Sequence, residues 1–375
     1  MPIHLHWYLP TNGDNRDVVG SGDGSQKGLA AVRSGFRAPT VDYLGGIARA
    51  AEQLGFEAVL TPTGTWCEDA WVTTAALSAV TTRLKFLVAF RPGFLSPTLA
   101  AHQAATFQRV SRGRLLLNIV TGGDPVEQRR FGDRLGHDER YARTEEFLTV
   151  LRGVSDATTP YDFHGQYYDI EQAAIPFTPY APPEIFFGGA SPAAQQVAAR
   201  TVDTYLAWGE TPPQIEERIA RVRALAAAAG RTVSFGVRFH VLGRDTAAAA
   251  WAEADRLLDR IGDDRIAEAQ RVLAASESVG QQRMVALHGG DRRNLEVYPN
   301  VWAGYGLVRG GAGTALVGSH DEVADRIEEY HRLGVDHFIL SGQPHLEEAY
   351  YFAEGAGAEL RRRGLTTPVE DGAQR

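Results

Sequence analysis

Short apolar runs alternate with amphipathic helical stretches from one end of the chain to the other. Each run has the length and composition of a buried parallel strand. The predicted strands cover Ile3–Leu9, Ala58–Pro62, Lys85–Phe90, Leu115–Val120, Glu184–Phe187, Thr204–Trp208, Phe235–Val241 and His337–Leu340. Parallel neighbours need crossover helices, so eight such runs separated by helices predict an α/β fold, a closed TIM (β/α)8 barrel.

The stretches between the apolar runs contain residues that are typical of the beginnings and ends of helices. Ser96 and Ser191 each precede a proline, which is the pattern of a capping residue before the first helical position. Ser319 and Thr211 each stand three residues before a glutamate or glutamine, which is capping-box spacing. Gly55 follows a helix with one apolar face and is expected to end it.

Four segments exceed what a minimal barrel needs. They are Gly13–Pro39, Gly122–His137, Tyr161–Pro183, which has a small β-like patch, and Thr246–Val317, which begins with a predicted helix over Thr246–Ile261. Insertions after strand ends lie where barrel enzymes keep their active sites. We expect one domain over residues 1–375, with insertions at the C-terminal face of the strands and part of Val279–Gly318 acting as a mobile lid.

Composition excludes several classes of function. The net charge of −8 disfavours a nucleic-acid partner, because a phosphate binder needs a basic surface. The single cysteine forbids an internal disulfide. The chain shows no signal peptide and no apolar run near the roughly 20 residues that span a bilayer, so we expect a cytoplasmic protein. No Rossmann or Walker signature is present, which disfavours a nicotinamide domain.

Two strand ends have the chemistry of a cofactor site. Gly188–Pro192 follows the fifth predicted strand and opens a helix, so its free amides suit a phosphate; a plain capped βα turn has the same pattern. Asn118–Asp124 ends the fourth strand with an amide, a hydroxyl and glycines, which suit a planar heterocycle; a turn that satisfies its own backbone is the alternative.

Positive side chains gather on the seventh predicted strand. Arg238 and His240 are two residues apart, so both point to one face, where they need an anion or water. Arg309 lies in a glycine-rich loop that is able to bring a guanidinium over a ligand. Structural ion pairs are the alternative reading; we favour function for Arg238 and His240, and not for Arg309 taken alone.

The remaining candidates have weaker patterns. Cys67, after the second strand, is read either as a small buried residue or as a hydrogen-bonding group at the barrel mouth. His4 and His6 share one face of the first strand without a carboxylate at metal-ligand spacing. We therefore expect core or lid-facing histidines there and no metal site.

Taken together, these segments resemble the alkanesulfonate monooxygenases of the bacterial luciferase-like superfamily over nearly the whole chain. The resemblance rests on Leu9-Pro-Thr11, Cys67-Glu-Asp-Ala-Trp71, Arg83–Ala89, Asn118–Pro125, Glu139-Arg-Tyr141, Phe187-Gly-Gly189, Gly280–Met284, Leu307–Gly318 and Pro344–Ala349. It implies a two-component flavin monooxygenase that uses reduced FMN and O₂ to convert a sulfonate into an aldehyde and sulfite. A separate NAD(P)H-dependent FMN reductase supplies the flavin, and we expect a dimer or tetramer.

The resemblance also implies roles for individual residues. The catalytic set is Cys67, Arg238, His240, Arg309 and His345; the substrate also contacts Trp208, Gln343 and Asn12; the flavin is bound by Asn118, Thr121, Tyr141, Gly189, Ala190 and Ser191. Asn12 and Gln343 stand where the family has histidine and tyrosine. These departures leave open a sulfone or a sulfonated sugar as substrate. Alternatives for the whole chain are a deazaflavin enzyme and a non-catalytic flavin-binding protein.

Overall fold

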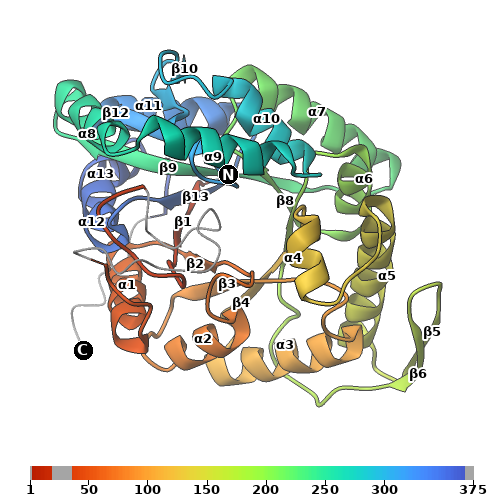
Figure 1. Ribbon diagram of the computed structural model, residues 1–375. Coiled ribbons are helices and arrows are strands. Elements are labelled where there is room, and N and C mark those ends of the chain that lie inside the picture. Colours follow the sequence, from red (N-terminus) through yellow and green to blue (C-terminus); the bar gives the residue numbers. More distant parts are fainter. Residues whose placement is uncertain (1, 19–35, 368–375) are drawn as a thin grey trace, which may run out of the picture.

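The computed structural model describes residues 2–18 and 36–367. Eight parallel strands close into a barrel surrounded by helices (Figure 1). Around the barrel they are β1 His4–Tyr8, β2 Ala58–Thr61, β3 Lys85–Phe90, β4 Leu115–Ile119, β7 Ile185–Gly188, β8 Thr204–Trp208, β9 Ser234–Arg244 and β13 His337–Ser341. The predicted (β/α)8 fold is confirmed, and each of the eight predicted runs overlaps one of these strands.

Helices connect the strands; most of them cover the outside of the barrel, and others lie over its mouth (Figure 1). They are α1 Val41–Leu54, α2 Ala70–Leu77, α3 Pro97–Ser111, α4 Pro125–Arg130, α5 His137–Asp156, α6 Pro192–Thr201, α7 Pro212–Ala228, α8 Ala247–Asp259, α9 Asp263–Ala274, α10 Val279–His288, α11 His320–Arg332, α12 His345–Glu354 and α13 Ala356–Arg362.

The predicted helix boundaries are confirmed. Ser96 and Ser191 cap α3 and α6, and each accepts a hydrogen bond from the backbone N–H three residues on. Thr211 and Ser319 begin α7 and α11 with capping boxes. Gly55 ends α1 with φ of 88°, a left-handed conformation that favours glycine.

The insertion after β9 differs from the sequence-based expectation. Ala315–Ser319 forms β12, a buried strand that pairs in parallel with the outer half of β9. This corrects two predictions: β9 runs to Arg244 instead of Val241, and the last part of the glycine-rich segment is strand. The reason is that the Ala-Leu-Val run of β12 gives the protruding half of β9 a hydrogen-bonding partner.

Three small elements complete the described chain. β10 Glu296–Tyr298 and β11 Val301–Trp302 extend the sheet from β12 in antiparallel fashion, and the 3₁₀ helix η1 Gly304–Leu307 follows them. β5 Tyr161–His164 and β6 Asp169–Ala173 pair as a separate hairpin, as the β-like patch predicted. Most of the predicted segment Gly13–Pro39 lies outside the described residues.

An apolar layer divides the interior of the barrel. Side chains of Ala58, Leu60, Leu87, Leu116, Phe186 and Ile339 pack together across the barrel axis. Tyr8 joins this layer at the C-terminal end of β1. The layer separates the mouth formed by the C-terminal strand ends from the opposite end of the barrel.

Histidines fill the opposite end. The rings of His4 and His6 stack on His337 with centroid distances of 4.6 and 5.3 Å, and His6 Nε2 lies 3.0 Å from His337 Nδ1. His4 also pairs with Glu57, which accepts a 2.8 Å hydrogen bond from Lys85. His6 is therefore a core histidine, as expected, and lies away from the mouth.

The free energy of unfolding is expected to fall as the pH decreases from about 7 to 4. Burial lowers the pKa of His6 to about 4 and that of His337 to about 2. An unfolded histidine has a pKa of about 6.5, so below that pH protons bind the unfolded chain preferentially. The stabilisation is complete above pH 6.5 and is lost as the pH falls through the folded pKa.

Urea unfolding at several pH values measures this slope. The double variant His6→Leu/His337→Phe should show a weaker pH dependence than the wild type. The variant His102→Gln, which changes an exposed residue of α3, should keep the wild-type slope. An unchanged slope in the double variant would contradict the assignment.

Candidate active site

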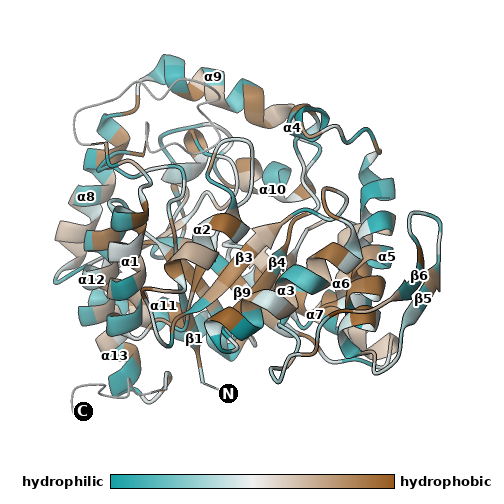
Figure 2. Cartoon of the chain, turned by 90° about the horizontal axis from the view of Figure 1, so that it is seen from below, coloured by the Kyte–Doolittle hydropathy of each residue, from teal (hydrophilic) through white to brown (hydrophobic). Residues whose placement is uncertain are grey.

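A cavity of about 960 Å³ opens at the C-terminal ends of the barrel strands. Its wall is made by the ends of β1, β2, β3, β4, β7, β8 and β9, and its roof by α9, the start of α10 and the loop Arg309–Ala312. Figure 2 shows α9 and α4 lying beyond one end of the strands. The volume is at the upper end of the range for ligand sites, so there is room for a cofactor together with a substrate.

One end of the cavity has the features of a phosphate site. Gly189, Ala190 and Ser191 lie between β7 and α6, and all three line the cavity with Tyr141 of α5. A Cβ on Gly189 would lie 2.5 Å from Cβ of Ala194, so only glycine fits there. Ser191 Oγ accepts a 3.2 Å hydrogen bond from the Ala194 N–H, as the capped-turn alternative expects, so the binding of a phosphate here stays a prediction.

The end of β4 supplies the next part of the wall. Asn118 and Thr121 both line the cavity. Thr121 Oγ1 is buried and has no hydrogen-bond partner among the described residues, while the Thr121 carbonyl accepts a 2.6 Å hydrogen bond from Gln128 Nε2. An unpaired buried hydroxyl next to an amide fits a ligand ring that carries both donors and acceptors.

The part of the cavity wall at β8 and β9 carries two arginines, Arg238 and Arg309. Arg238 of β9 and Trp208 of β8 are register partners, and both line the cavity. The Arg238 guanidinium carbon lies 4.1 Å from the centroid of the Tyr8 ring. Arg238 Nε is buried without a hydrogen-bond partner. Burial lowers the pKa of Arg238, and Arg309 lowers it further; the guanidinium still keeps its charge, so an anion is the natural partner.

His240 is held by contacts to both of its ring nitrogens. Nδ1 lies 2.9 Å from Ser341 Oγ, and Nε2 lies 3.2 Å from the carbonyl oxygen of Ala312. A carbonyl only accepts, so this network assigns the proton to Nε2 and makes Nδ1 the acceptor. The ring also stacks on Tyr305 at 3.9 Å. Burial, and then Arg309 and Arg238, lower the His240 pKa well below its usual value. His240 is therefore neutral.

Arg309 lies in a loop that is closed by two glycines. The Gly306 N–H donates to the Gly313 carbonyl at 2.8 Å, and a Cβ on Gly313 would lie 2.8 Å from Cα of Gly306. Arg309 is buried at the cavity, with its guanidinium carbon 5.8 Å from the Tyr305 ring centroid. The glycine-rich pattern therefore serves a close backbone crossing that holds this arginine.

Four of the predicted site residues do not line the cavity: Cys67, Asn12, Gln343 and His345. The Cys67 thiol lies 3.7 Å from two backbone carbonyl oxygens, and burial raises its pKa to about 12, so it is not a thiolate. Gln343 and His345 are buried, and both amide atoms of Gln343 lack a hydrogen-bond partner among the described residues.

Two features of the site were missed at the sequence level. Arg265 of α9 lines the cavity, and its Nη2 is buried without a hydrogen-bond partner. Glu210 also lines it and pairs with Arg218 and Arg283, which ties α10 in the roof to the rim of β8. Glu210 comes two residues after Trp208, which the sequence placed at a strand end. The same pattern could therefore have placed Glu210 at the barrel mouth.

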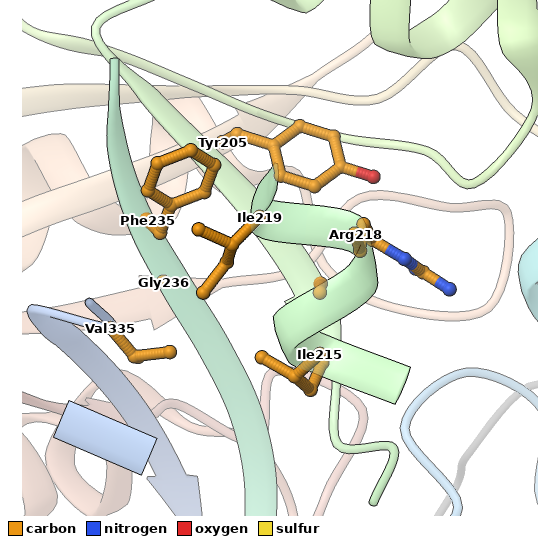
Figure 3. A pocket seen from close by; sticks show the side chains of 8 residues that line it. Tyr205, Ile215, Arg218, Ile219, Phe235, Gly236 and Val335 are labelled. Atoms are coloured by element: carbon orange, nitrogen blue, oxygen red, sulfur yellow. The ribbon is translucent and has the colours of Figure 1, made fainter. Parts of the chain in front are cut away.

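A second cavity lies between α7 and the strands β8 and β9 (Figure 3). Its volume is about 10 Å³, close to the space of one water molecule. In Figure 3 the Arg218 guanidinium and the Tyr205 hydroxyl point away from Ile219 and Phe235. This cavity is a small packing gap and is too small for a substrate.

The described residues lack both a metal-binding cluster and a membrane-spanning helix. No group of three or more His, Cys, Asp or Glu side chains in residues 2–18 and 36–367 is arranged to hold a metal ion. In the same ranges, no helix is both long enough and apolar enough to cross a membrane.

Comparison with known proteins gives a family and a set of similar folds. The model of the luciferase-like monooxygenase family matches residues 4–337. A riboflavin lyase (RcaE), solved with modified FMN and riboflavin, is 20% identical with a TM-score of 0.78, over 98% of this chain and 93% of that one. EDTA monooxygenase (EmoA) from Chelativorans sp. BNC1 is 20% identical with a TM-score of 0.74, over 99% and 96%. An F420-dependent secondary alcohol dehydrogenase is 16% identical with a TM-score of 0.67, over 96% and 99%.

Proposed function

Because this chain belongs to the luciferase-like monooxygenase family, we propose that it is a two-component flavin monooxygenase that uses reduced FMN and O₂ to desulfonate an alkanesulfonate. The products are an aldehyde and sulfite. The observation that carries the sulfonate assignment is the part of the cavity wall that carries Arg238 and Arg309. There the Arg238 Nε is buried without a partner, on β9, which only one strand, β8, separates from the Gly189–Ser191 segment after β7.

The cavity suits FMN in particular. Gly189, Ala190 and Ser191 would bind the phosphate with Tyr141, and Asn118 with Thr121 would bind the ring. Reduced FMN supplies the electrons that activate O₂. A deazaflavin carries a longer tail beyond its phosphate, so FMN is the simpler occupant of a cavity that must also hold a substrate. A separate NAD(P)H-dependent reductase is the proposed source of the reduced flavin.

The two arginines and their neighbours have distinct proposed tasks. Arg238 and Arg309 bind the sulfonate oxygens, because a guanidinium donates two parallel hydrogen bonds to such a group. His240 is neutral and adds no third positive charge beside Arg238 and Arg309. Its ring is held by hydrogen bonds with Ser341 and the Ala312 carbonyl. Trp208 forms the apolar wall beside them, where Cβ of an alanine at Gly280 would lie 3.1 Å from its ring. The roof excludes water from the reaction.

Subunit association is also proposed. We propose a homo-oligomer, a dimer or tetramer, because large apolar side chains at Val72, Val110 and Phe177 are more than 65% exposed. Light scattering of the purified chain would measure the subunit number.

A related activity on another organosulfur compound is the second candidate function. Its motive is that Asn12 and Gln343 depart from the family pattern; neither lines the cavity, so they would change the choice of substrate, for example toward a sulfonated sugar, through the residues in front of them. A non-catalytic flavin-binding protein is less well supported, because flavin storage needs no second anion site. Such a protein would bind FMN without releasing sulfite.

The function is tested by one assay. Reduced FMN is generated by a flavin reductase, a panel of alkyl, hydroxyalkyl and sugar sulfonates and a sulfone is offered, and sulfite and aldehyde are measured. We expect sulfite and aldehyde in equal amounts from at least one sulfonate. Flavin binding without sulfite from any compound would refute the proposed function.

The double variant Gln343→Tyr/Asn12→His is expected to favour simple alkanesulfonates over polar ones by about tenfold in kcat/KM. The reason is that Gln343 lies two residues after Ser341, which contacts His240, so a larger aromatic ring at this position would reshape the cavity wall indirectly, and one altered contact changes specificity by an amount of this order. The measurement is kcat/KM for octanesulfonate and for a hydroxyalkanesulfonate.

The single variants separate the contributions of the two positions. If the wild type already prefers unsubstituted alkanesulfonates, and the double variant changes both rates equally, the specificity account fails. In that case the two positions act on proton supply, because tyrosine and histidine exchange protons and amides do not.

A further inference from the structure

Asp14 and His345 form a buried pair beside the candidate active site. Asp14 Oδ1 lies 2.9 Å from His345 Nδ1, and Asp14 Oδ2 accepts a 2.8 Å hydrogen bond from the His345 backbone N–H. The side chain of Asp14 is fully buried, and that of His345 is 2% exposed. Within residues 2–18 and 36–367, no other close histidine–carboxylate pair has both side chains this buried.

The surroundings keep Asp14 ionised. Burial would raise its pKa, but His345 and the Tyr43 hydroxyl, which donates at 2.6 Å, bring the pKa below its usual value. Arg37 donates to the Tyr43 oxygen and to Glu347, so Tyr43 is itself held in place. A carboxylate only accepts hydrogen bonds, so His345 Nδ1 must carry a proton toward Asp14.

The other nitrogen of His345 is available. His345 Nε2 is buried and has no hydrogen-bond partner among the described residues. His240 has both nitrogens engaged, and the Cys67 thiol stays protonated. At this side of the mouth His345 Nε2 is therefore the nitrogen that is free to accept a proton.

Direct contacts connect the pair to the cavity wall. The His345 ring lies 5.6 Å from the ring of Tyr8, which lines the cavity and carries Arg238 on its face at 4.1 Å. Trp7 Nε1 donates to the His345 carbonyl at 3.0 Å. The Asp14–His345 pair, called the dyad below, is thus separated from the proposed anion site by the side chain of Tyr8. Its charged and titratable neighbours are Tyr43, Arg37 and Glu347 on the outer side, and Tyr8, Arg238 and His240 on the cavity side.

We propose that Asp14 is a positioning residue that holds His345 so that Nε2 takes up a proton during the reaction. This proposal rests on the proposed function. Gln343, two residues before His345, has both amide atoms buried without a partner, so a water molecule bound to them and to Nε2 would supply the path to the cavity.

The proton step follows from the chemistry of the product. Oxygen insertion at the carbon that bears sulfur gives a hydroxysulfonate. Its carbon–sulfur bond breaks with the electron pair leaving on sulfite, and the hydroxyl electrons form the aldehyde C=O. The hydroxyl proton passes through the water to His345 Nε2, and the ionised Asp14 stabilises the imidazolium that results.

The first test measures which ring nitrogen of His345 carries the proton, and it needs no activity assay. ¹⁵N spectra of histidine-labelled chain, assigned with His345→Gln, should show a protonated Nδ1 and an unprotonated Nε2 near pH 8. In Asp14→Asn the preference for the Nδ1–H form should weaken. A wild-type His345 with its proton on Nε2 would overturn the proposal.

The second test is the pH dependence of kcat/KM for sulfite release. Asp14→Asn should lower the rate about 100-fold at neutral pH and move the limb that reports the dyad to lower pH, because an amide stabilises the imidazolium less. Asp14→Glu should recover part of the loss. Asp42→Asn, an exposed change in the first turn of α1, is the control and should match the wild type.

The outcomes separate the two proposals. If the wild type releases no sulfite, the proposed function fails and with it the proton step, while the spectra still decide the dyad. If sulfite is released and Asp14→Asn keeps the wild-type profile, the role of the dyad is overturned. His345→Gln, whose amide can still donate to Asp14, gives the same decision where Asp14→Asn does not fold.

Discussion

Replacing Arg238 by alanine is expected to lower kcat/KM for sulfite release by roughly 30- to 1000-fold. The loss of a charged hydrogen bond in a desolvated site costs about 2–4 kcal/mol, which corresponds to that range of rates. Arg238 lines the cavity, and its Nε is buried without a hydrogen-bond partner, so its contact with an anion would be made away from bulk water. Steady-state sulfite assays measure the change.

Two further variants interpret this result. Arg238→Lys keeps the charge and loses the planar fork, so it should recover only part of the rate. Arg293→Ala removes an exposed arginine that pairs with Asp291 on the surface, and it should behave like the wild type. A full rate in Arg238→Ala would mean that the sulfonate binds elsewhere in the cavity.

Replacing Glu210 by alanine is expected to lower the free energy of unfolding by about 3–5 kcal/mol, which is typical when one partner of a buried ion pair is removed. Glu210 is 1% exposed and binds Arg218, which is also buried, as well as Arg283 of α10. Its loss would leave the Arg218 charge buried without its carboxylate and release α10 from the barrel rim. Thermal and urea unfolding with a folded-state spectrum measure the effect.

The matched control is another glutamate–arginine pair, which involves α7 alone. Glu217 pairs with Arg221 four residues on, and both are more than half exposed. Glu217→Ala should change the stability by no more than about 0.5 kcal/mol. Equal effects of the two variants would show that burial of Glu210 has no energetic consequence.

The sequence by itself determined the barrel. Parallel strands buried on both faces must be apolar along their whole length, so they stand out from amphipathic helices without any tertiary information. Capping residues such as Ser96 and Thr211 act on the backbone within four residues, so they too could be identified locally. The same reasoning marked the glycines before α6 and the arginine on β9.

What lies over the barrel mouth was decided by tertiary structure. Ala315–Ser319 is a strand because it pairs with the protruding end of β9. A strand is stable only when it is paired with another strand, and the sequence of Ala315–Ser319 does not show which strand lies beside it. Arg265 was not identified because its helix is polar, and only the path of α9 across the mouth brings this side chain to the cavity.

The Asp14–His345 pair shows why the rest of the site needed the structure. The two residues are 331 positions apart, and neither has a local pattern that names the other. They meet because β1 and β13 are neighbours in the closed barrel, so that both strand ends deliver their loops to the same place. The local sequence determines which residues follow each strand. Which strand ends lie side by side is determined by barrel closure, because closure depends on hydrogen bonds between strands that are far apart in the chain.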